Sequence, residues 1–433
     1  MPDVAEPSTL RLAGIPRLGH ADASLALLAD PYRFITRHCK AFGSDLFETR
    51  LLLQPAICMT GADLAGLFYD ASRFRREGAA PEALQATLFG KGVVQGLDDD
   101  RHRIRKALFL SLRSAPRLAD LESQVRHAWE QAIPGWSAAG RVALYRAIQP
   151  VLTRAACAWA GVPLADGDLT RRSRQLTLLF DGAASGIVPH LQARRARWQA
   201  ERWLGKLVEE FRQGQSSLPA GSIAQAFACH RDAAGRLLAA RVVAAELLNV
   251  LRPTVAVSVY IAFVAHALQA QPAWRERLAD LATEVDPVPP VDVLAFVQEV
   301  RRHYPFFPAV VARVRESFEW RGLHFTQGRR ILLDLYGTNH DPRWWAEPQC
   351  FSPERWLQGS PGIYEFIPQG GGEAAVHHRC PGEDVAVRLM MLAVRMLLRR
   401  MRYEVPAQDL ALAMNRLPAI PRDGFIIDRV RMA

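Results

Sequence analysis

The chain has 433 residues, of which 49% are hydrophobic and 23% are charged, and its 54 lysines and arginines outnumber its 44 aspartates and glutamates to give a formal charge of +10. This composition excludes an intrinsically disordered chain and allows a sizeable hydrophobic core. The charge indicates a solvated, arginine-rich surface and no nucleic-acid partner, because the basic runs at 171–174 and 193–198 lie on separate amphipathic segments. An acidic partner or an anionic ligand is compatible with it.

Neither the first residues nor the cysteines indicate a secreted protein. The first 20 residues have no basic segment followed by an apolar one, so we expect no signal peptide. The cysteines include no C-x-x-C pair, which argues against a disulfide framework and a zinc–thiolate site; they occupy positions 39, 58, 157, 229, 350 and 380. This pattern fits a protein of the reducing cytoplasm.

Hydrophobic periodicity predicts a mainly α chain. Alternating residues at 45–61, interrupted at Pro55, predict strands near the N-terminus. Helical periodicity then dominates, over residues 100–112, 116–133, 141–160, 168–181, 188–213 and 238–271. A second strand region follows at 318–337. No repeat or separating linker interrupts the chain, so we expect one domain over residues 1–433, with a small β region from its N-terminal and C-terminal parts.

The longest predicted helix has to be considered as a possible transmembrane segment. Residues 244–270 are largely apolar and long enough to span a bilayer. Polar residues and a proline interrupt this stretch at Glu246, Asn249, Arg252, Pro253 and His266. Ionisable groups at this density are costly in hydrocarbon, so we expect a buried central helix and no transmembrane segment.

Cys380 stands in the stretch QGGGEAAVHHRCPGE (369–383), directly before a helical pattern. A helix N-terminus and the neighbouring Arg379 both stabilise a thiolate. An inert core thiol, a catalytic nucleophile and a metal ligand are the alternatives; His377 or His378 could serve a nucleophile only if a ring points at the sulfur. A zinc site lacks further ligands at usable spacing. A haem thiolate needs one cysteine, close glycine backbone and cations for the propionates, all of which this segment offers.

A second constellation is the pair Glu299 and Arg302. Three residues apart on a helix, they share a face and can form an ion pair. Taken alone, such a pair is most simply a surface salt bridge. The strand region and the segment FSPERW that follow change this expectation, because Arg355 could complete a buried Glu–Arg–Arg cluster.

In order along the chain, Glu299-x-x-Arg302, the Pro-Glu-Arg segment ending at Arg355, and a glycine-rich loop ending in Cys380 and Gly382 resemble the motifs of the cytochrome P-450 family. The resemblance covers essentially the whole chain. It implies the cytochrome P-450 fold, a triangular helical domain. It further implies haem b held by the Cys380 thiolate as axial ligand of the iron, and a structural triad of Glu299, Arg302 and Arg355.

The loop before the cysteine is longer than the usual family form. Together with Arg379 directly before the cysteine, this makes the segment similar to the bacterial fatty-acid peroxygenase branch of the family. His377 departs from the small residue expected there. The departure bears on the side of the haem that faces the cysteine.

Arg252 and Pro253 interrupt the long apolar helix. The proline removes one backbone hydrogen bond and bends the helix. An arginine in an apolar interior keeps its proton and therefore needs a buried anion. One alternative is an ion pair with Glu246, although a separation of six residues places the two on different helix faces. The other is a substrate carboxylate bound bidentately by the guanidinium.

The resemblance favours the substrate carboxylate. Ordinary members of the family carry an acid followed by threonine at this bend, whereas this chain has Arg252, Pro253 and Thr254. The peroxygenase branch uses hydrogen peroxide, and the fatty-acid carboxylate held by the arginine supplies the acid–base group. This implies hydroxylation at the alpha or beta carbon by a cytoplasmic enzyme without an obligatory redox partner. Alternatives are a fatty-acid decarboxylase forming terminal alkenes, a redox-partner-dependent monooxygenase, and a haem sensor or carrier without turnover.

The stretch 86–109 resembles the distal loop and following helix of that branch. By this resemblance Phe89 and Gln95 line the distal pocket, and the glutamine is the residue of hydroxylating members where decarboxylating ones have histidine. The physical basis is that histidine can donate a proton near pH 7 and an amide cannot.

Three further residues of this stretch, His102, Arg105 and Lys106, fit haem propionates together with Arg379, although a solvated basic face explains them too. Phe306 resembles a pocket aromatic near the substrate. It is equally explained as a core residue.

Overall fold

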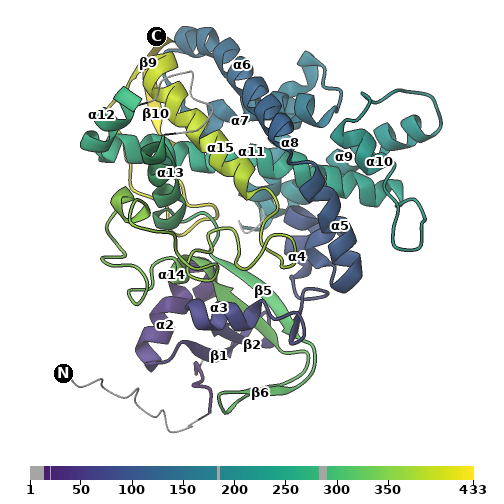
Figure 1. Ribbon diagram of the computed structural model, residues 1–433, viewed down its shortest axis with the longest axis vertical. Helices are drawn as coiled ribbons and strands as arrows, with labels where there is room; N and C mark the ends of the chain where they lie inside the picture. The colour runs from purple at the N-terminus through teal and green to yellow at the C-terminus, as the bar shows by residue number, and fades with distance from the viewer. Residues whose placement is uncertain (1–13, 20, 183–185, 282–289) are drawn as a thin grey trace.

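The computed structural model describes residues 14–19, 21–182, 186–281 and 290–433, so most of the N-terminal stretch used for the signal-peptide expectation lies outside the described residues. Helices form the upper part of the molecule in Figure 1, and the largest sheet lies below them. The α-helices are α1 Ser24–Ala29, α2 Phe34–Phe42, α3 Ala62–Phe68, α4 Glu82–Leu84, α5 Asp99–Ser111, α6 Ala115–Ala139, α7 Leu144–Ala160, α8 Leu169–Asp181, α9 Ile187–Arg212, α10 Ile223–Ala228, α11 Ala240–Ala270, α12 Pro272–Leu281, α13 Val291–His303, α14 Leu335–Thr338 and α15 Glu383–Arg395.

Short helical turns and strands complete the described elements. The turns are η1 Gln85–Phe89, η2 Val94–Gly96, η3 Asp166–Asp168, η4 Pro353–Trp356 and η5 Met396–Arg400. The strands are β1 Leu46–Leu51, β2 Gln54–Met59, β3 Phe74–Arg75, β4 Val142–Ala143, β5 Ala309–Val314, β6 Phe318–Trp320, β7 Leu323–Phe325, β8 Arg330–Asp334, β9 Met401–Glu404 and β10 Ile426–Met432. The mainly α prediction is therefore confirmed.

All six predicted helices occur, as α5 to α9 and α11, with ends that differ by a few residues. The largest difference without proline as its cause is at α7, which begins three residues later than predicted. Val142 and Ala143 instead form β4, which pairs with Ile427 and Ile426 of β10. A strand contributed from the end of the chain thus overrides the local helical pattern. At α6 the helix continues through Pro134, one residue past its predicted end, as far as Ala139.

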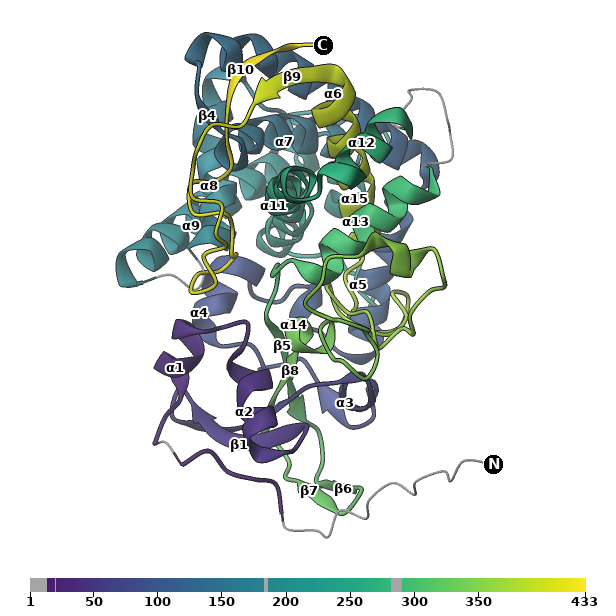
Figure 2. The same ribbon diagram turned by 90° about the vertical axis from the view of Figure 1, so that its left-hand side faces the viewer.

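Helix α11 is the centre of the fold. It is the one helix among the described residues whose length and composition would allow it to cross a membrane, and 94% of its most apolar window is buried within the protein. It contacts α7, α8, α9, α13 and α15. Figure 2 looks along this helix and shows the others arranged around it. It is a core helix, as the polar interruptions predicted.

The largest sheet has the order β1-β2-β8-β5-β3 and joins distant parts of the chain. Its β2–β8 pairing is parallel, and the other pairings are antiparallel. The predicted break at Pro55 is wrong by two residues, because the turn lies at Leu52 and Leu53, which have φ values of 53° and 59°. Pro55 lies in β2 opposite Arg50, just before the first residue paired with β8, where its missing N–H costs no ladder bond.

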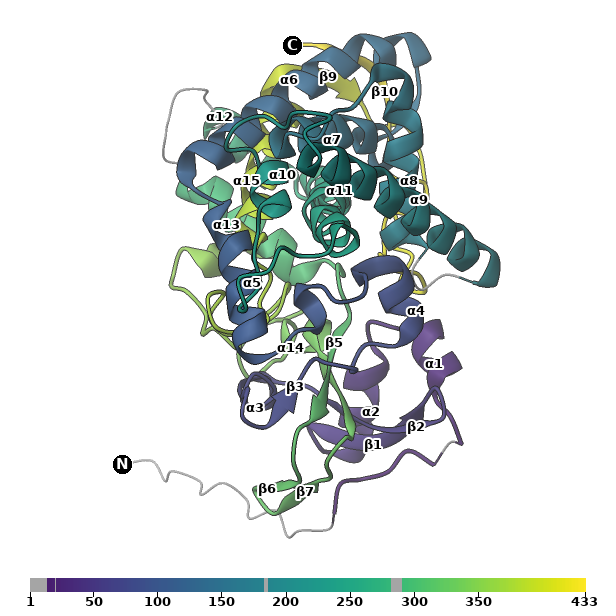
Figure 3. The ribbon, with the colours of Figure 1, turned by 90° about the vertical axis from the view of Figure 1, so that its right-hand side faces the viewer.

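The second predicted strand region is partly helical. It forms the hairpin β6–β7 and the strand β8, but residues after Asp334 turn into α14. The Asp334 carboxylate accepts a hydrogen bond from the Gly337 N–H at 2.7 Å and so caps this helix. Figure 3 shows α4 and α5 at the level where the helical part meets the sheet.

Candidate active site

Cys380 lies just before α15, in a loop held by Lys106 of α5. Lys106 donates from Nζ to the carbonyl oxygens of His377, at 3.0 Å, and of Arg379. Arg379 itself donates to Glu383 and to the Gly372 carbonyl at 3.2 Å. Burial raises the pKa of the Cys380 thiol, and the Gly382 N–H, Lys106 and Arg252 oppose this effect. The thiolate therefore needs a further positive partner, such as a metal ion.

Neither histidine of this loop serves the sulfur as a base. The Nδ1 atom of His377 accepts the Glu373 N–H at 2.9 Å. The His378 ring stacks on His102 with centroids 3.9 Å apart, and its Nε2 lies 3.7 Å from Asp98. The two loop histidines therefore give the nucleophile alternative for Cys380 no support.

The loop fits a haem bound through a single cysteine. The described residues contain no group of three or more histidine, cysteine or acidic side chains that could hold a metal ion, so Cys380 would be the one protein ligand. At Gly371 a Cβ would lie 2.8 Å from Ile367 and 3.1 Å from Tyr69, so the backbone is packed too closely for a side chain. Buried polar atoms without a protein partner include Nε of Arg105 and Arg252.

Arg252 is the buried cation of α11. Its side chain is 8% exposed, its Nη2 donates to Asn249 Oδ1 at 3.4 Å, and its Nε has no partner. Burial, and then the nearby charge of Arg197, lower the pKa of the guanidinium to about 9, while the Cys380 thiolate would oppose this. No carboxylate among the described residues forms an ion pair with it, so the buried charge has no counterion there.

Glu246 has other partners, so the ion pair with Arg252 does not form. It pairs with Arg105 of α5 and accepts hydrogen bonds from the Val94 N–H at 2.9 Å and Asn249 Nδ2 at 3.2 Å. Burial raises the pKa of this carboxyl, and Arg105 opposes the rise. Arg105, which the sequence suggested for a haem propionate, therefore has a protein carboxylate as its partner here.

The predicted distal residues come from two short turns beside α11. Gln95 lies on η2, and its Oε1 accepts a hydrogen bond from Asn249 at 3.2 Å. Phe89 ends η1 and is half-buried against the core. Phe306 stacks on Tyr260 of α11 with ring centroids 4.2 Å apart. Gln95 and Phe306 thus contact side chains of α11, and Phe89 packs against the hydrophobic core that includes this helix.

The three basic residues of α5 predicted for the propionates are not a solvated face. His102, Arg105 and Lys106 are all buried, and each has a specific contact. His102 stacks on His378, Arg105 forms an ion pair with Glu246, and Lys106 donates hydrogen bonds to loop carbonyls. Burial lowers the pKa of His102 to about 4. Their role toward propionates stays a prediction.

Glu299 lies at the centre of the predicted triad, between Arg302 and Arg355. Arg302 donates to its two carboxylate oxygens at 2.7 and 2.8 Å, and Arg355 Nε lies 3.3 Å away. The Ser352 N–H and Trp356 Nε1 donate to the same carboxylate at 2.8 and 3.0 Å. The structure thus brings the three residues together in a buried cluster between α13 and η4.

Sequence reasoning missed two residues of this region. Asn249 lies three residues before Arg252, so the helical spacing alone could have placed it on the same face. Arg197, in a basic run interpreted as solvated, is instead buried and donates to the carbonyls of Thr87, Leu88 and Phe89 at 3.1–3.4 Å. No sequence pattern signals that contact, because it joins α9 to η1.

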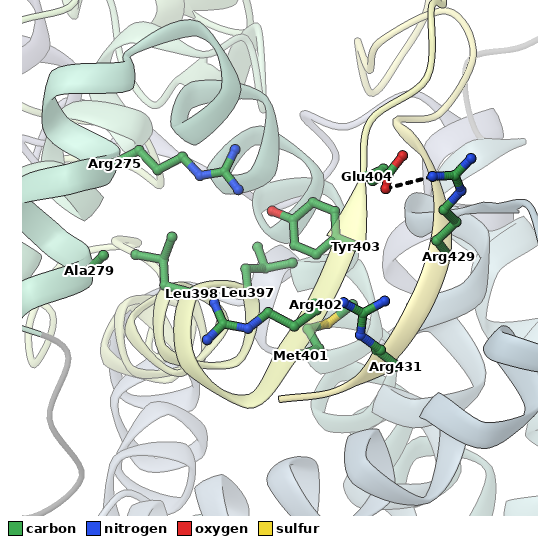
Figure 4. A pocket seen from close by; sticks show the side chains of 10 residues that line it. All are labelled: Arg275, Ala279, Leu397, Leu398, Met401, Arg402, Tyr403, Glu404, Arg429 and Arg431. Carbon is green, nitrogen blue, oxygen red and sulfur yellow. Dashed lines mark hydrogen bonds and ion pairs between the residues drawn. The ribbon is translucent and has the colours of Figure 1, made fainter.

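A cavity of about 320 Å³ lies between α12, η5, β9 and β10 (Figure 4). Its lining residues are Arg275, Ala279, Leu397, Leu398, Met401, Arg402, Tyr403, Glu404, Arg429 and Arg431. None of these is a predicted site residue. The cavity is separate from the surroundings of Cys380 and Arg252.

Comparison with known proteins identifies the fold. The family model described as cytochrome P-450 matches residues 293–425. Ferruginol synthase of Salvia miltiorrhiza is 31% identical over 124 residues, which are 28% of this chain and 24% of that protein. The chain matches between 22% and 37% of the length of the first curated relatives.

Solved structures match over nearly the full length. Cytochrome P450SP alpha (CYP152B1) in complex with (R)-ibuprophen is 47% identical, covers 95% of this chain and 99% of its own, and has a TM-score of 0.91. The chain belongs to the cytochrome P-450 family. Two further P-450 structures also have TM-scores of 0.91 and cover 97% of this chain and 99% of their own: P450EX alpha (CYP152N1) with myristic acid, at 38% identity, and ligand-free OleT, at 30%.

These relatives place the chain in the fatty-acid peroxygenase branch that its loop and its Arg252 segment resemble. As a P-450 enzyme it is a haem-thiolate oxidoreductase. The predicted cytochrome P-450 fold is confirmed.

Proposed function

We propose that this enzyme uses hydrogen peroxide to hydroxylate fatty acids at the alpha or beta carbon, with Arg252 holding the substrate carboxylate. The balanced reaction converts one C–H bond and one peroxide into an alcohol and water. The observation that carries the proposal is the buried guanidinium of Arg252, which has no anionic partner among the described residues and lies within electrostatic reach of Cys380.

Haem b on the Cys380 thiolate would supply the oxidising chemistry, because the thiolate donates electron density that favours O–O cleavage. Arg252 would bind the carboxylate bidentately, through its partner-free Nε and one Nη. A carboxylate fixed in this way brings its nearest carbons to one defined position. Pro253, next along α11, has no N–H to donate to the Asn249 carbonyl.

The bound carboxylate would also provide the acid–base group. Glu246 is the nearest carboxylate on α11, and it is already engaged by Arg105, Val94 and Asn249. Gln95 can donate a hydrogen bond but cannot exchange a proton near pH 7. This favours hydroxylation over decarboxylation, while Phe89 and Phe306 would line the acyl chain.

Two solved relatives support an acid as the substrate. P450EX alpha was solved with myristic acid, and P450SP alpha with (R)-ibuprophen, which also carries a carboxylate. We extend this to a single catalytic domain over residues 1–433 in the cytoplasm that needs no redox partner.

The test is peroxide-driven turnover of myristic acid by the haem-loaded enzyme, comparing wild type with Arg252→Ala and identifying products by mass spectrometry. We expect hydroxymyristic acid from wild type and a loss of about 100-fold or more in kcat/KM for the variant. Terminal alkene as the main product would support the decarboxylase instead. Turnover only with a ferredoxin and reductase would support a monooxygenase, and a thiolate-haem spectrum without any product would indicate a sensor or carrier.

A further inference from the structure

Asn249 contacts both polar side chains that the proposed function places at the substrate. Its Oδ1 accepts a hydrogen bond from Arg252 Nη2 at 3.4 Å. Its Nδ2 donates to Gln95 Oε1 at 3.2 Å and to Glu246 Oε2 at 3.2 Å. The side chain is 7% exposed, so all three contacts form inside the protein.

The chemistry of its neighbours fixes how the Asn249 amide is oriented. A guanidinium can only donate hydrogen bonds, and an ionised carboxylate can only accept them. The amide oxygen must therefore face Arg252 and the NH₂ group must face Glu246. Gln95 shares that NH₂ group, so it must accept through Oε1, and its own NH₂ group is left to face away from Asn249 as a donor.

Glu246 anchors this arrangement to two other elements. It pairs with Arg105 of α5 and accepts the N–H of Val94, the residue before Gln95 on η2. The backbone of η2 and the side chain of Gln95 are thus both tied to one turn of α11. A chain of fixed donors and acceptors runs from Arg105 through Glu246 and Asn249 to Arg252 and Gln95.

We propose that Asn249 is a positioning residue that sets the orientation of Arg252 and Gln95 together, and through them which carbon of the bound acid is oxidised. The proposal rests on the proposed function. The alpha and beta carbons of a clamped acid are one bond apart, and a misplacement of about 1 Å can change the rate of an oriented reaction about 100-fold. A small tilt of the guanidinium is therefore enough to change the ratio of the two products.

The experiment compares the full-length, haem-loaded wild type with Asn249→Ala and Asn249→Asp. Ser258→Ala is the matched control, since Ser258 is buried on the same helix and its hydroxyl has no partner. Calorimetry gives the Kd for myristic acid, and mass spectrometry gives the ratio of alpha to beta products. Binding of imidazole, which needs no carboxylate clamp, reports whether the haem pocket is intact.

For Asn249→Ala we expect a Kd raised about 3- to 10-fold, a changed product ratio and unchanged imidazole binding, because one weak contact to a charged group is lost. For Asn249→Asp we expect a Kd raised about 10-fold or more, because the new carboxylate would occupy Arg252 and repel Glu246. Ser258→Ala should match wild type in every measurement.

A wild-type Kd and product ratio in both Asn249 variants would overturn the proposal. So would parallel loss of imidazole and myristic acid binding in both, since this would make Asn249 a structural residue. If wild type forms no hydroxy acid, the proposed function fails; the calorimetric Kd values still decide whether Asn249 positions the clamp.

Discussion

Two buried arginines, in α13 and in α11, have opposite surroundings. Arg302 donates to both oxygens of Glu299 and to the carbonyls of Asn339, Pro348 and Cys350, all at 2.7–3.1 Å. Arg252 makes one side-chain hydrogen bond within the described residues, to Asn249 at 3.4 Å. A buried ion whose bonds are complete holds the structure together, whereas one with incomplete bonds costs free energy until a ligand completes them. The difference distinguishes a structural arginine from a binding one.

The largest expected effect is a loss of stability when the Glu299–Arg302 pair is broken. Removing the carboxylate in Glu299→Ala leaves Arg302 buried without its anion, which should cost about 3–5 kcal/mol of unfolding free energy. Urea unfolding and the yield of haem-loaded protein measure this. Glu276→Ala, which removes an exposed carboxylate of α12, is the control and should change stability by less than about 1 kcal/mol. Equal effects of the two would contradict the structural role of Glu299.

Ligand binding should stabilise the incomplete site. Myristic acid at 100 times its Kd should raise the unfolding free energy of wild type by about 2.7 kcal/mol. The same concentration should leave Arg252→Leu almost unchanged, because the carboxylate has lost its partner. Denaturant titrations with and without the acid provide the measurement, and equal stabilisation of both proteins would show that the acid binds elsewhere.

Without ligand, the variant at the incomplete site should be the more stable protein. Replacing Arg252 by leucine removes a buried charge that has no counterion, so we expect Arg252→Leu to gain about 1–3 kcal/mol over wild type while losing turnover. Urea unfolding of the acid-free enzymes measures this. A stability loss similar to that of Glu299→Ala would mean that Arg252 is structural.

Asp334 extends the comparison to a buried anion. It accepts hydrogen bonds from Thr36 at 2.6 Å and from the Gly337 N–H, but forms no ion pair within the described residues, and burial raises its pKa to about 7. Between its ordinary pKa and pH 7 the native state holds a proton that the unfolded state has released. Its contribution to stability is thus complete below about pH 4 and is lost as pH rises to 7, by at most about 1.4 kcal/mol per pH unit.

Unfolding measured from pH 4 to pH 8 tests this, with Asp334→Asn for comparison. Between pH 4 and pH 7, the unfolding free energy of wild type should fall relative to that of Asp334→Asn. A difference that stays constant would show that Asp334 is ionised throughout.

How far the sequence predicts the molecule depends on how local the cause is. The helical pattern of 238–271 predicts α11 within two residues, because its apolar residues act within one helix. The spacing of Glu299 and Arg302 likewise predicts that they share a face. The sequence pattern instead places the strand break at Pro55, two residues after the real turn. Pro55 is tolerated within β2 because of where it lies in the sheet, and that depends on the strand order, which is not a local property.

The partners of the site residues are tertiary and were therefore hidden. Arg105 and Glu246 are 141 residues apart, and Arg197 reaches η1 across 108 residues or more. Only the meeting of α5, η1, α9 and α11 brings these groups together. The sequence indicated that Arg252 needs an anion, but not that Asn249 and Gln95 share one hydrogen-bond network with it.

The parallel pairing of β2 with β8 has a consequence for biosynthesis. Ala56 must pair with Arg330, so the edge of β2 stays open on the ribosome until β8 emerges. At about 5–20 residues per second, the roughly 270 residues between them take about 14–54 seconds to make. During that time the nascent chain exposes a strand edge that can pair with another chain. Slower, cooler expression with abundant chaperones should therefore improve the yield of this enzyme more than a stronger promoter would.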